Sequence, residues 1–268
     1  MPVVSLGEIY KLTILLLGIG TCIRAAETLW LKDANRIRGI FDWQITGNDL
    51  FLSRKHSRYY GVIYGEKGMS IMSVLVILCF VALILFHRQP PFFKPILIVF
   101  LILNLAMHYR QSYGLDGADQ MALLITITIL LCYAFFEYEA IMKIGLAFIA
   151  IQLALSYIVS GIAKLISEQW RSGFAIEGIL GTFTYGTPFT RTVLTRSKTL
   201  CLTFAWLTIV FEILFPLGIF LGMPQIFVLL AAGFIFHFSI AVTMGLNDFV
   251  WAFSAAYPAF YFISTQIH

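Results

Sequence analysis

The sequence predicts an all-α integral membrane protein, a bundle of about eight transmembrane helices with two structured loops on one face. Of its 268 residues, 60% are hydrophobic and only 12% are charged, and the mean hydropathy is +0.88. A soluble domain is nearer half apolar and a quarter charged, so a soluble enzyme, a disordered chain and a fibrous chain are all excluded. The 25 Phe and 12 Tyr suit lipid-facing and interfacial surfaces.

Eight apolar runs approach the roughly 20 residues that a helix needs to cross a bilayer. The third follows Pro90 and Pro91 and the seventh begins with Pro224, and proline suits a helix start. The runs lie at about 10–30, 69–87, 92–109, 120–137, 140–164, 198–221, 224–244 and 248–266. No alternating pattern typical of a membrane strand repeats. We therefore expect a single transmembrane domain over residues 1–268, and we expect the first apolar run to remain as a span because no basic segment of a signal peptide precedes it.

Two long connections, about 31–68 and 165–197, lie on the same face when the chain has eight spans. Both contain more aromatic residues than a disordered linker does, which predicts structured loops over the bundle. These aromatic residues are Phe41, Trp43, Phe51, Tyr59, Tyr60, Trp170, Phe174, Phe183 and Tyr185. The short turn 110–119 lies on this face too, and we expect Asp119 to cap the helix that follows it.

The loop-rich face carries thirteen Lys and Arg residues and the other face about four. By the positive-inside rule, the loop-rich face is cytoplasmic. The chain is thus expected in the cell membrane as a multi-pass protein, with lipid as its immediate partner. The small net charge of +4, with no basic tail, gives no indication of nucleic-acid binding.

Three ionisable residues fall within or at the end of apolar runs, where they are costly and usually functional. Lys164 ends the fifth run, and Tyr157, Ser160 and Gly161 share its helix face at i, i+3, i+4 and i+7. A desolvated lysine can act as a base. The alternative is a lysine that snorkels to the interface and anchors the helix end.

Glu212 lies in the middle of the sixth run and His237 in the seventh. Each could bind substrate or protons, and each could equally be a hydrogen-bonded residue between helices. Trp170 follows Lys164 closely and is expected to pack near it, and Arg110 begins the short turn on the same face. The sequence contains no phosphate loop, nucleophile elbow or HExxH motif, and its four cysteines have no metal-ligand spacing.

Taken together, these residues resemble the HTTM family, the membrane domain of the vitamin K-dependent gamma-carboxylase type. The resemblance covers about residues 100–260. It rests on Tyr157-x-x-Ser160-Gly161-Ile162-Ala163-Lys164-Leu165-x4-Trp170-x2-Gly173, on Glu212 followed by Pro216, on Phe236-His237-Phe238, on Gly245-Leu246-x2-Phe249 and on the turn Asp116-Gly117-Ala118-Asp119. The match is closer to the small bacterial members similar to the sporulation-delaying protein B group, which help to mature a secreted peptide.

The resemblance implies that Lys164 is a catalytic base, because the carboxylase uses the lysine of this pattern to deprotonate a vitamin K hydroquinone. His237 would be its catalytic partner, and Tyr157, Ser160, Glu212, Trp170 and Arg110 would bind substrate. A quinone-like cofactor and a secreted peptide precursor would be the partners, and no metal is implied. The carboxylase site faces the lumen, which corresponds to the outside of a bacterium and contradicts the charge count. The sequence therefore leaves the orientation open, with a slight preference for an extracytoplasmic site because several cations are expected to pack into the site face.

Two departures from the family limit what is carried over. The carboxylase has a functional histidine near the turn between the third and fourth spans, where this sequence has Ser112. No large lumenal domain follows the last span, so true gamma-carboxylation is not expected. The alternatives are a non-catalytic membrane partner, a transporter-like protein in which Glu212 and His237 bind substrate or protons, and a scaffold in which the polar residues only hold helices together.

Overall fold

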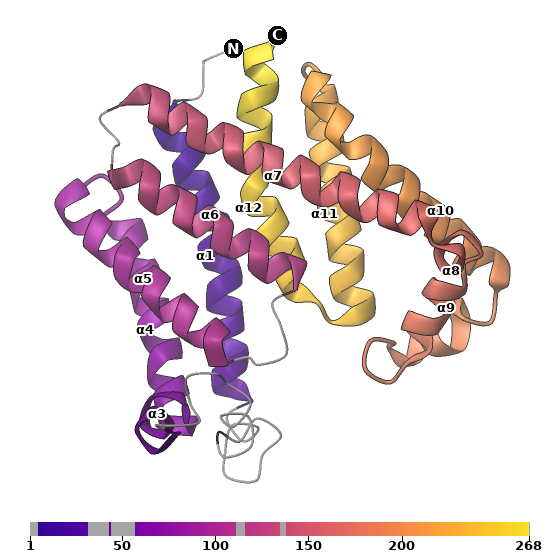
Figure 1. The fold of residues 1–268 in the computed structure, drawn as a ribbon, viewed down its shortest axis with the longest axis horizontal. Helices are drawn as coiled ribbons and strands as arrows, with labels where there is room; N and C mark the ends of the chain where they lie inside the picture. The colour runs from indigo at the N-terminus through magenta and orange to yellow at the C-terminus, as the bar shows by residue number, and fades with distance from the viewer. Residues whose placement is uncertain (1–4, 32–42, 44–56, 111–115, 135–137, 268) are drawn as a thin grey trace. The chain divides into compact units, whose positions relative to one another are not determined.

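The computed structural model describes residues 5–31, 43, 57–110, 116–134 and 138–267. These residues form helices and connecting turns and contain no β-strand. The α-helices drawn in Figure 1 are α1 (Leu6–Trp30), α3 (Ser57–Tyr64), α4 (Glu66–Leu85), α5 (Pro90–Arg110), α6 (Gly117–Ala134), α7 (Glu139–Ile166), α8 (Glu168–Arg171), α9 (Phe174–Gly181), α10 (Lys198–Leu214), α11 (Gln225–Met244) and α12 (Asn247–Ile267). A π-helical turn, η2 (Thr190–Leu194), precedes α10, and a 3₁₀ turn, η3 (Phe215–Phe220), extends it.

All eight predicted runs correspond to helices, and six of these helices are long and apolar enough to cross a membrane. These six are α1, α4, α5, α7, α10 with η3, and α11. The apolar part of α6 is shorter, at Gly117–Tyr133, and α12 is not among the six. The all-α membrane fold is therefore confirmed by the helices, whereas the count of eight spans stays a prediction.

Helix α7 is apolar on its exposed side as well as on its buried side, as expected of a helix in lipid. The buried residues recur every three or four positions and form one stripe: Met142, Gly145, Leu146, Ile149, Ala150, Leu153, Tyr157 and Gly161. The exposed residues are equally apolar and follow the same period: Ile144, Phe148, Ile151, Leu155, Val159 and Ile162. A helix with apolar residues all round is typical of a membrane span.

The chain divides into two compact units. The first unit comprises residues 1–13 and 139–268, and the second comprises residues 14–138. The expectation of a single transmembrane domain over residues 1–268 is not addressed by this division and stays a prediction. The first unit contains α7 to α12, and the second contains most of α1 together with α3 to α6.

In the first unit, α7 packs against α10 and α12, and α11 packs against α12 (Figure 1). Gly161 allows the close approach of α7 to α10. A methyl group at this position would lie 2.8 Å from Ile213 Cγ1 and 3.1 Å from Glu212 Cβ. The glycine therefore brings the backbone of α7 to the turn of α10 that carries Glu212, as small residues do between membrane helices.

In the second unit, α4 packs against α5, and α5 begins at Pro90 as the sequence predicts. Arg110, at the end of α5, is buried and donates from Nε to the carbonyl oxygen of Tyr64 at 2.8 Å. The ring of Tyr64 stacks on that of Trp43, with centroids 5.0 Å apart. Arg110 thus connects the end of α5 to the end of α3.

The 165–197 connection is structured, as predicted, and contains α8, α9 and η2. Gly173, between α8 and α9, has φ of 80°, a left-handed conformation that favours glycine. Most of the 31–68 loop lies outside the described residues, including Phe41 and Phe51, so its predicted structure is not tested. Ser112 and the turn at 135–137 also lie outside them.

The predicted cap at Asp119 is wrong, because Asp116 caps α6 instead. The Asp116 Oδ1 atom accepts hydrogen bonds from the backbone N–H groups of Ala118 and Asp119, both at 2.9 Å. These are the second and third helical positions after Asp116, the donors that an N-cap side chain satisfies. The Asp119 side chain is left to pair with Arg24, at 2.7 Å from its Nη2 atom.

Candidate functional site

Lys164 and Glu212 form an ion pair between α7 and α10. The Lys164 Nζ atom lies 2.7 Å from Glu212 Oε2 and 2.9 Å from Oε1. The two side chains are only 17% and 8% exposed. Both residues were predicted from the sequence as site residues, and the structure brings them into direct contact.

Two further predicted residues complete the surroundings of the Lys164 ammonium group. Ser160, one turn earlier on α7, accepts a hydrogen bond from Lys164 Nζ and donates to Glu212 Oε1 at 3.3 Å. The Trp170 ring of α8 lies 5.1 Å from Nζ, within cation–π distance. The amine is thus surrounded by a carboxylate, a hydroxyl and an aromatic face.

This arrangement does not match a snorkelling lysine. A snorkelling side chain extends its charged head outward into water. The Lys164 head instead turns toward α10 and is mostly buried there with Glu212. An ammonium held in this way keeps only a small part of its contact with solvent.

Tyr157, His237 and Tyr257 form a second buried polar cluster, on α7, α11 and α12. The Tyr157 hydroxyl lies 2.8 Å from His237 Nε2 and 3.2 Å from the Tyr257 hydroxyl. All three residues are buried. The Nδ1 atom of His237 is buried and has no hydrogen-bond partner among the described residues.

A consistent assignment of donors follows from these contacts. If the Tyr257 hydroxyl donates to the Tyr157 oxygen, then Tyr157 donates to His237 Nε2. His237 then carries its proton on Nδ1, since only one ring nitrogen of a neutral imidazole is a donor. In this assignment, the His237 Nδ1–H group has no hydrogen-bond acceptor among the described residues.

Aromatic rings enclose the second cluster. The ring of Phe215 stacks on Tyr157, with centroids 4.0 Å apart, and Phe253 lies 4.2 Å from His237 between centroids. Phe211 meets the edge of Tyr157 at 5.9 Å. This packing holds the Tyr157 and His237 side chains in fixed orientations, because buried aromatic rings have little room to rotate.

The two clusters lie along one face of α7. Tyr157 and Lys164 are seven residues apart, two helical turns, which is about 10 Å along the axis. The sequence predicted this face, and the structure places Glu212 at its Lys164 end and His237 at its Tyr157 end. Arg110, also predicted to bind substrate, is described in the second unit, where it contacts Tyr64.

The sequence reasoning missed Tyr257 in the first unit and a charged cluster in the second. In that cluster Arg24 of α1 pairs with Asp119 of α6, and His108 of α5 lies 3.4 Å from Asp119 Oδ1 through Nδ1. The His108 Nε2 atom lies 3.1 Å from Arg24 Nη1. The signal was present in the sequence, since Arg24 interrupts an apolar run and needs a compensating acid.

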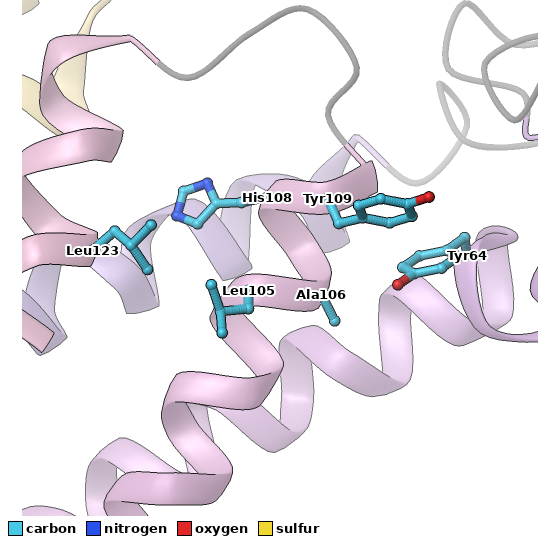
Figure 2. Close-up of a pocket in the computed structure, with 6 residues that line it drawn as sticks. All are labelled: Tyr64, Leu105, Ala106, His108, Tyr109 and Leu123. Atoms are coloured by element: carbon cyan, nitrogen blue, oxygen red, sulfur yellow. The ribbon is translucent and has the colours of Figure 1, made fainter. Parts of the chain in front are cut away.

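A cavity of about 570 Å³ lies beside this cluster in the second unit. Figure 2 shows Tyr109 and Tyr64 at one end of it and His108 and Leu123 at the other, with Leu105 and Ala106 between them. His108 is the imidazole of the charged cluster, and its ring nitrogens are close to Arg24 and Asp119. Apart from His108, the residues that line this cavity are aliphatic or aromatic.

Among the described residues, no group of three or more His, Cys, Asp and Glu side chains could hold a metal ion. The four cysteines are free thiols. No protein-family model, curated protein or solved structure matches the chain.

Proposed function

We propose that this multi-pass membrane protein is a bacterial HTTM-type enzyme or maturation factor that modifies a secreted peptide, with Lys164 as its base. The observation that carries the proposal is the buried contact between Lys164 Nζ and Glu212, at 2.7 Å, between two helices that are apolar enough to span a membrane. Ionisable groups at such positions are rare and usually functional.

The pair gives Lys164 a route to the neutral amine that a base requires. In apolar surroundings, two separate charges are costly to bury. Passing a proton from the Lys164 ammonium to the Glu212 carboxylate leaves two neutral groups in hydrogen-bond contact. The Lys164 amine can then take a proton from a substrate X–H group, which yields X⁻ beside a new ammonium ion.

His237 supplies the second part of the proposed site. Its Nδ1 atom is buried without a partner among the described residues, and when it carries the ring proton it can donate to a substrate oxygen. A hydrogen bond donated by Tyr157 to Nε2, with Tyr257 donating to Tyr157, would hold the imidazole in the tautomer that leaves this donor free. The role of His237 is to orient the substrate through this hydrogen bond.

The resemblance to the HTTM family adds a quinone-like cofactor to the proposal. The unpartnered Nδ1 atom of His237 fits a ligand with a hydrogen-bonding oxygen, and Lys164 and Ser160 offer polar groups two turns along α7. When bound, such a cofactor would supply an acidic hydroxyl group. The residues of this chain would bind it, orient it and accept its proton.

The alternative is a non-catalytic membrane partner or transporter-like protein, and the completeness of the ion pair favours it. Lys164 contacts both carboxylate oxygens of Glu212 as well as Ser160. A pair satisfied in this way could serve only to lock α7 against α10. Removal of one partner of such a pair destabilises the protein, whereas replacement of both partners by neutral groups is tolerated.

The experiment is mass spectrometry of the peptides secreted by bacterial cells that express the wild type, Lys164→Ala or Lys143→Ala. Lys143 is the matched control, because it lies on the same helix and forms an exposed ion pair with Glu139 at 2.7 Å. We expect a modified peptide to be detected in cells that express the wild type or Lys143→Ala. The same peptide mass should be absent from cells that express Lys164→Ala. Identical peptides from all three strains would favour the alternative.

A further inference from the structure

The segment of residues 165–198, which joins α7 to α10, contains four exposed aromatic side chains. The rings are those of Phe174, Phe183, Tyr185 and Phe189, and Phe183 is 92% exposed. We call this segment the interfacial segment. In water, so many exposed rings within one short segment would be unfavourable, and such patches usually mark an interaction surface.

The interfacial segment packs against α10 and joins two candidate spans. Helix α7 ends at Ile166 and α10 begins at Lys198, so the segment starts and finishes where candidate membrane helices end. Its inner side packs on α10, since a methyl group at Gly173 would lie 2.7 Å from the backbone nitrogen of Leu202. Figure 1 shows α8 and α9 beside this end of α10. The segment therefore joins the ends of two candidate membrane helices.

The charge of the interfacial segment is positive. Four basic residues, Arg171, Arg191, Arg196 and Lys198, stand against two acids, Glu168 and Glu177. Arg171, Arg196 and Lys198 are exposed. The Arg191 guanidinium lies 4.1 Å from the centroid of the Phe183 ring, which joins a cation to the most exposed aromatic side chain. Aromatic rings beside basic groups are typical of protein surfaces in the headgroup region.

We propose that the interfacial segment binds anionic phospholipids of the surrounding bilayer. The exposed Phe rings insert at the boundary between headgroups and acyl chains. Arg171, Arg191, Arg196 and Lys198 bind the phosphate groups and select lipids with a net negative charge. This surface is independent of the Lys164 chemistry, because none of these four cations belongs to the proposed site.

The test is photochemical lipid labelling of the whole protein in phosphatidylcholine nanodiscs. One sample contains a trace of headgroup-photoreactive phosphatidylglycerol and the other a trace of the matching phosphatidylcholine, and labelled peptides are mapped by mass spectrometry. We expect peptides from residues 165–198 to receive at least about fivefold more label from phosphatidylglycerol, the factor that a single basic residue near the surface contributes. Equal labelling by the two lipids in the wild type overturns the proposal.

Two quadruple variants test which residues cause the preference for phosphatidylglycerol over phosphatidylcholine. The first replaces the basic residues of the interfacial segment: Arg171→Gln, Arg191→Gln, Arg196→Gln and Lys198→Gln. The matched control removes four basic residues elsewhere: Lys11→Gln, Arg88→Gln, Lys94→Gln and Lys143→Gln. The first variant should bring the labelling ratio to about one, and the control should keep the wild-type ratio; a ratio that survives in the first variant contradicts the proposal.

The aromatic side chains are tested separately, with Phe174→Ser, Phe183→Ser and Phe189→Ser combined. This variant should lower labelling of the segment by both lipids, because insertion is lost, while the ratio between the lipids is kept because the cations remain. Unchanged labelling by both lipids would show that the rings do not insert. Size-exclusion profiles of each variant confirm that the protein remains folded.

Discussion

The Lys164 Nζ atom lies 2.7 Å from Glu212 Oε2, so the two costliest polar side chains on α7 and α10 neutralise one another. Gly161 makes this contact feasible, because it lets the α10 backbone at Ile213 approach α7 one turn before Lys164. The same pair can serve as a structural clamp or as the proton-holding part of a site. Substitutions at these positions separate the two roles.

Removing one charge of the pair should destabilise the protein more than removing both. Glu212→Gln leaves the Lys164 ammonium without its counter-ion and should lower the free energy of unfolding by about 3 kcal/mol. In the double variant Lys164→Met/Glu212→Gln, no charge remains to be buried, and most of that loss should be recovered. Thermal unfolding in one detergent measures all the variants. If the double variant lost as much stability as Lys164→Met and Glu212→Gln lose together as single variants, the two residues would not be energetically coupled.

Gly161→Ala should separate α7 from α10. The added methyl group would lie 2.8 Å from Ile213 Cγ1 and 3.0 Å from the Ile213 nitrogen, so the backbone must move. Overpacking of this kind costs about 2 kcal/mol. Gly178→Ala in α9 is the control, since a methyl group there meets no heavy atom within 4 Å. The melting temperature should fall only for Gly161→Ala, and equal melting temperatures would mean that the helices are not closely packed at this point.

Tyr157→Phe should weaken the second cluster while keeping its ring packing. The variant loses the hydroxyl that contacts His237 and Tyr257 but keeps the stack on Phe215. Leaving buried polar groups without this partner should cost about 1–2 kcal/mol. Tyr185→Phe, at an exposed position, should leave the melting temperature unchanged. The interpretation fails if both variants unfold at the wild-type temperature.

The charged cluster of the second unit gives a paired test on two aspartates three residues apart. Asp119→Asn removes the carboxylate that lies 2.7 Å from Arg24 Nη2 and should cost about 3 kcal/mol, because Arg24 loses the negative charge beside it. Asp116→Asn should cost little, since asparagine caps a helix nearly as well as aspartate does. Similar losses in the two variants, measured by thermal unfolding, would contradict the assigned roles.

The membrane fold could be predicted from the sequence because apolar runs long enough to cross a bilayer, repeated along one chain, are typical of membrane-spanning helices. Lys164, Glu212 and His237 were identifiable for a related reason, since each is a costly polar residue in apolar surroundings. Their partners were not predictable. The contact between Lys164 and Glu212 joins residues 48 positions apart and depends on how α7 packs on α10.

Tyr257 was missed because a tyrosine in an aromatic-rich run is indistinguishable, by composition, from one that faces lipid. The Asp119 cap was mispredicted because two aspartates in one turn offer the same side chain three residues apart. Only the position of Arg24 shows which of the two is needed for an ion pair. Local sequence does not contain that information, since α1 and α6 are far apart in the chain.

The most direct test of Lys164 as a base is the comparison of Lys164→Arg with Lys164→Ala in the secreted-peptide experiment. Arginine keeps the positive charge and can still pair with Glu212, but it stays protonated at physiological pH and cannot accept a proton. We predict that both variants insert and fold, and that neither produces the peptide mass that depends on the wild type. Peptide production restored by Lys164→Arg would contradict the proposal, because a charge-holding role would then suffice.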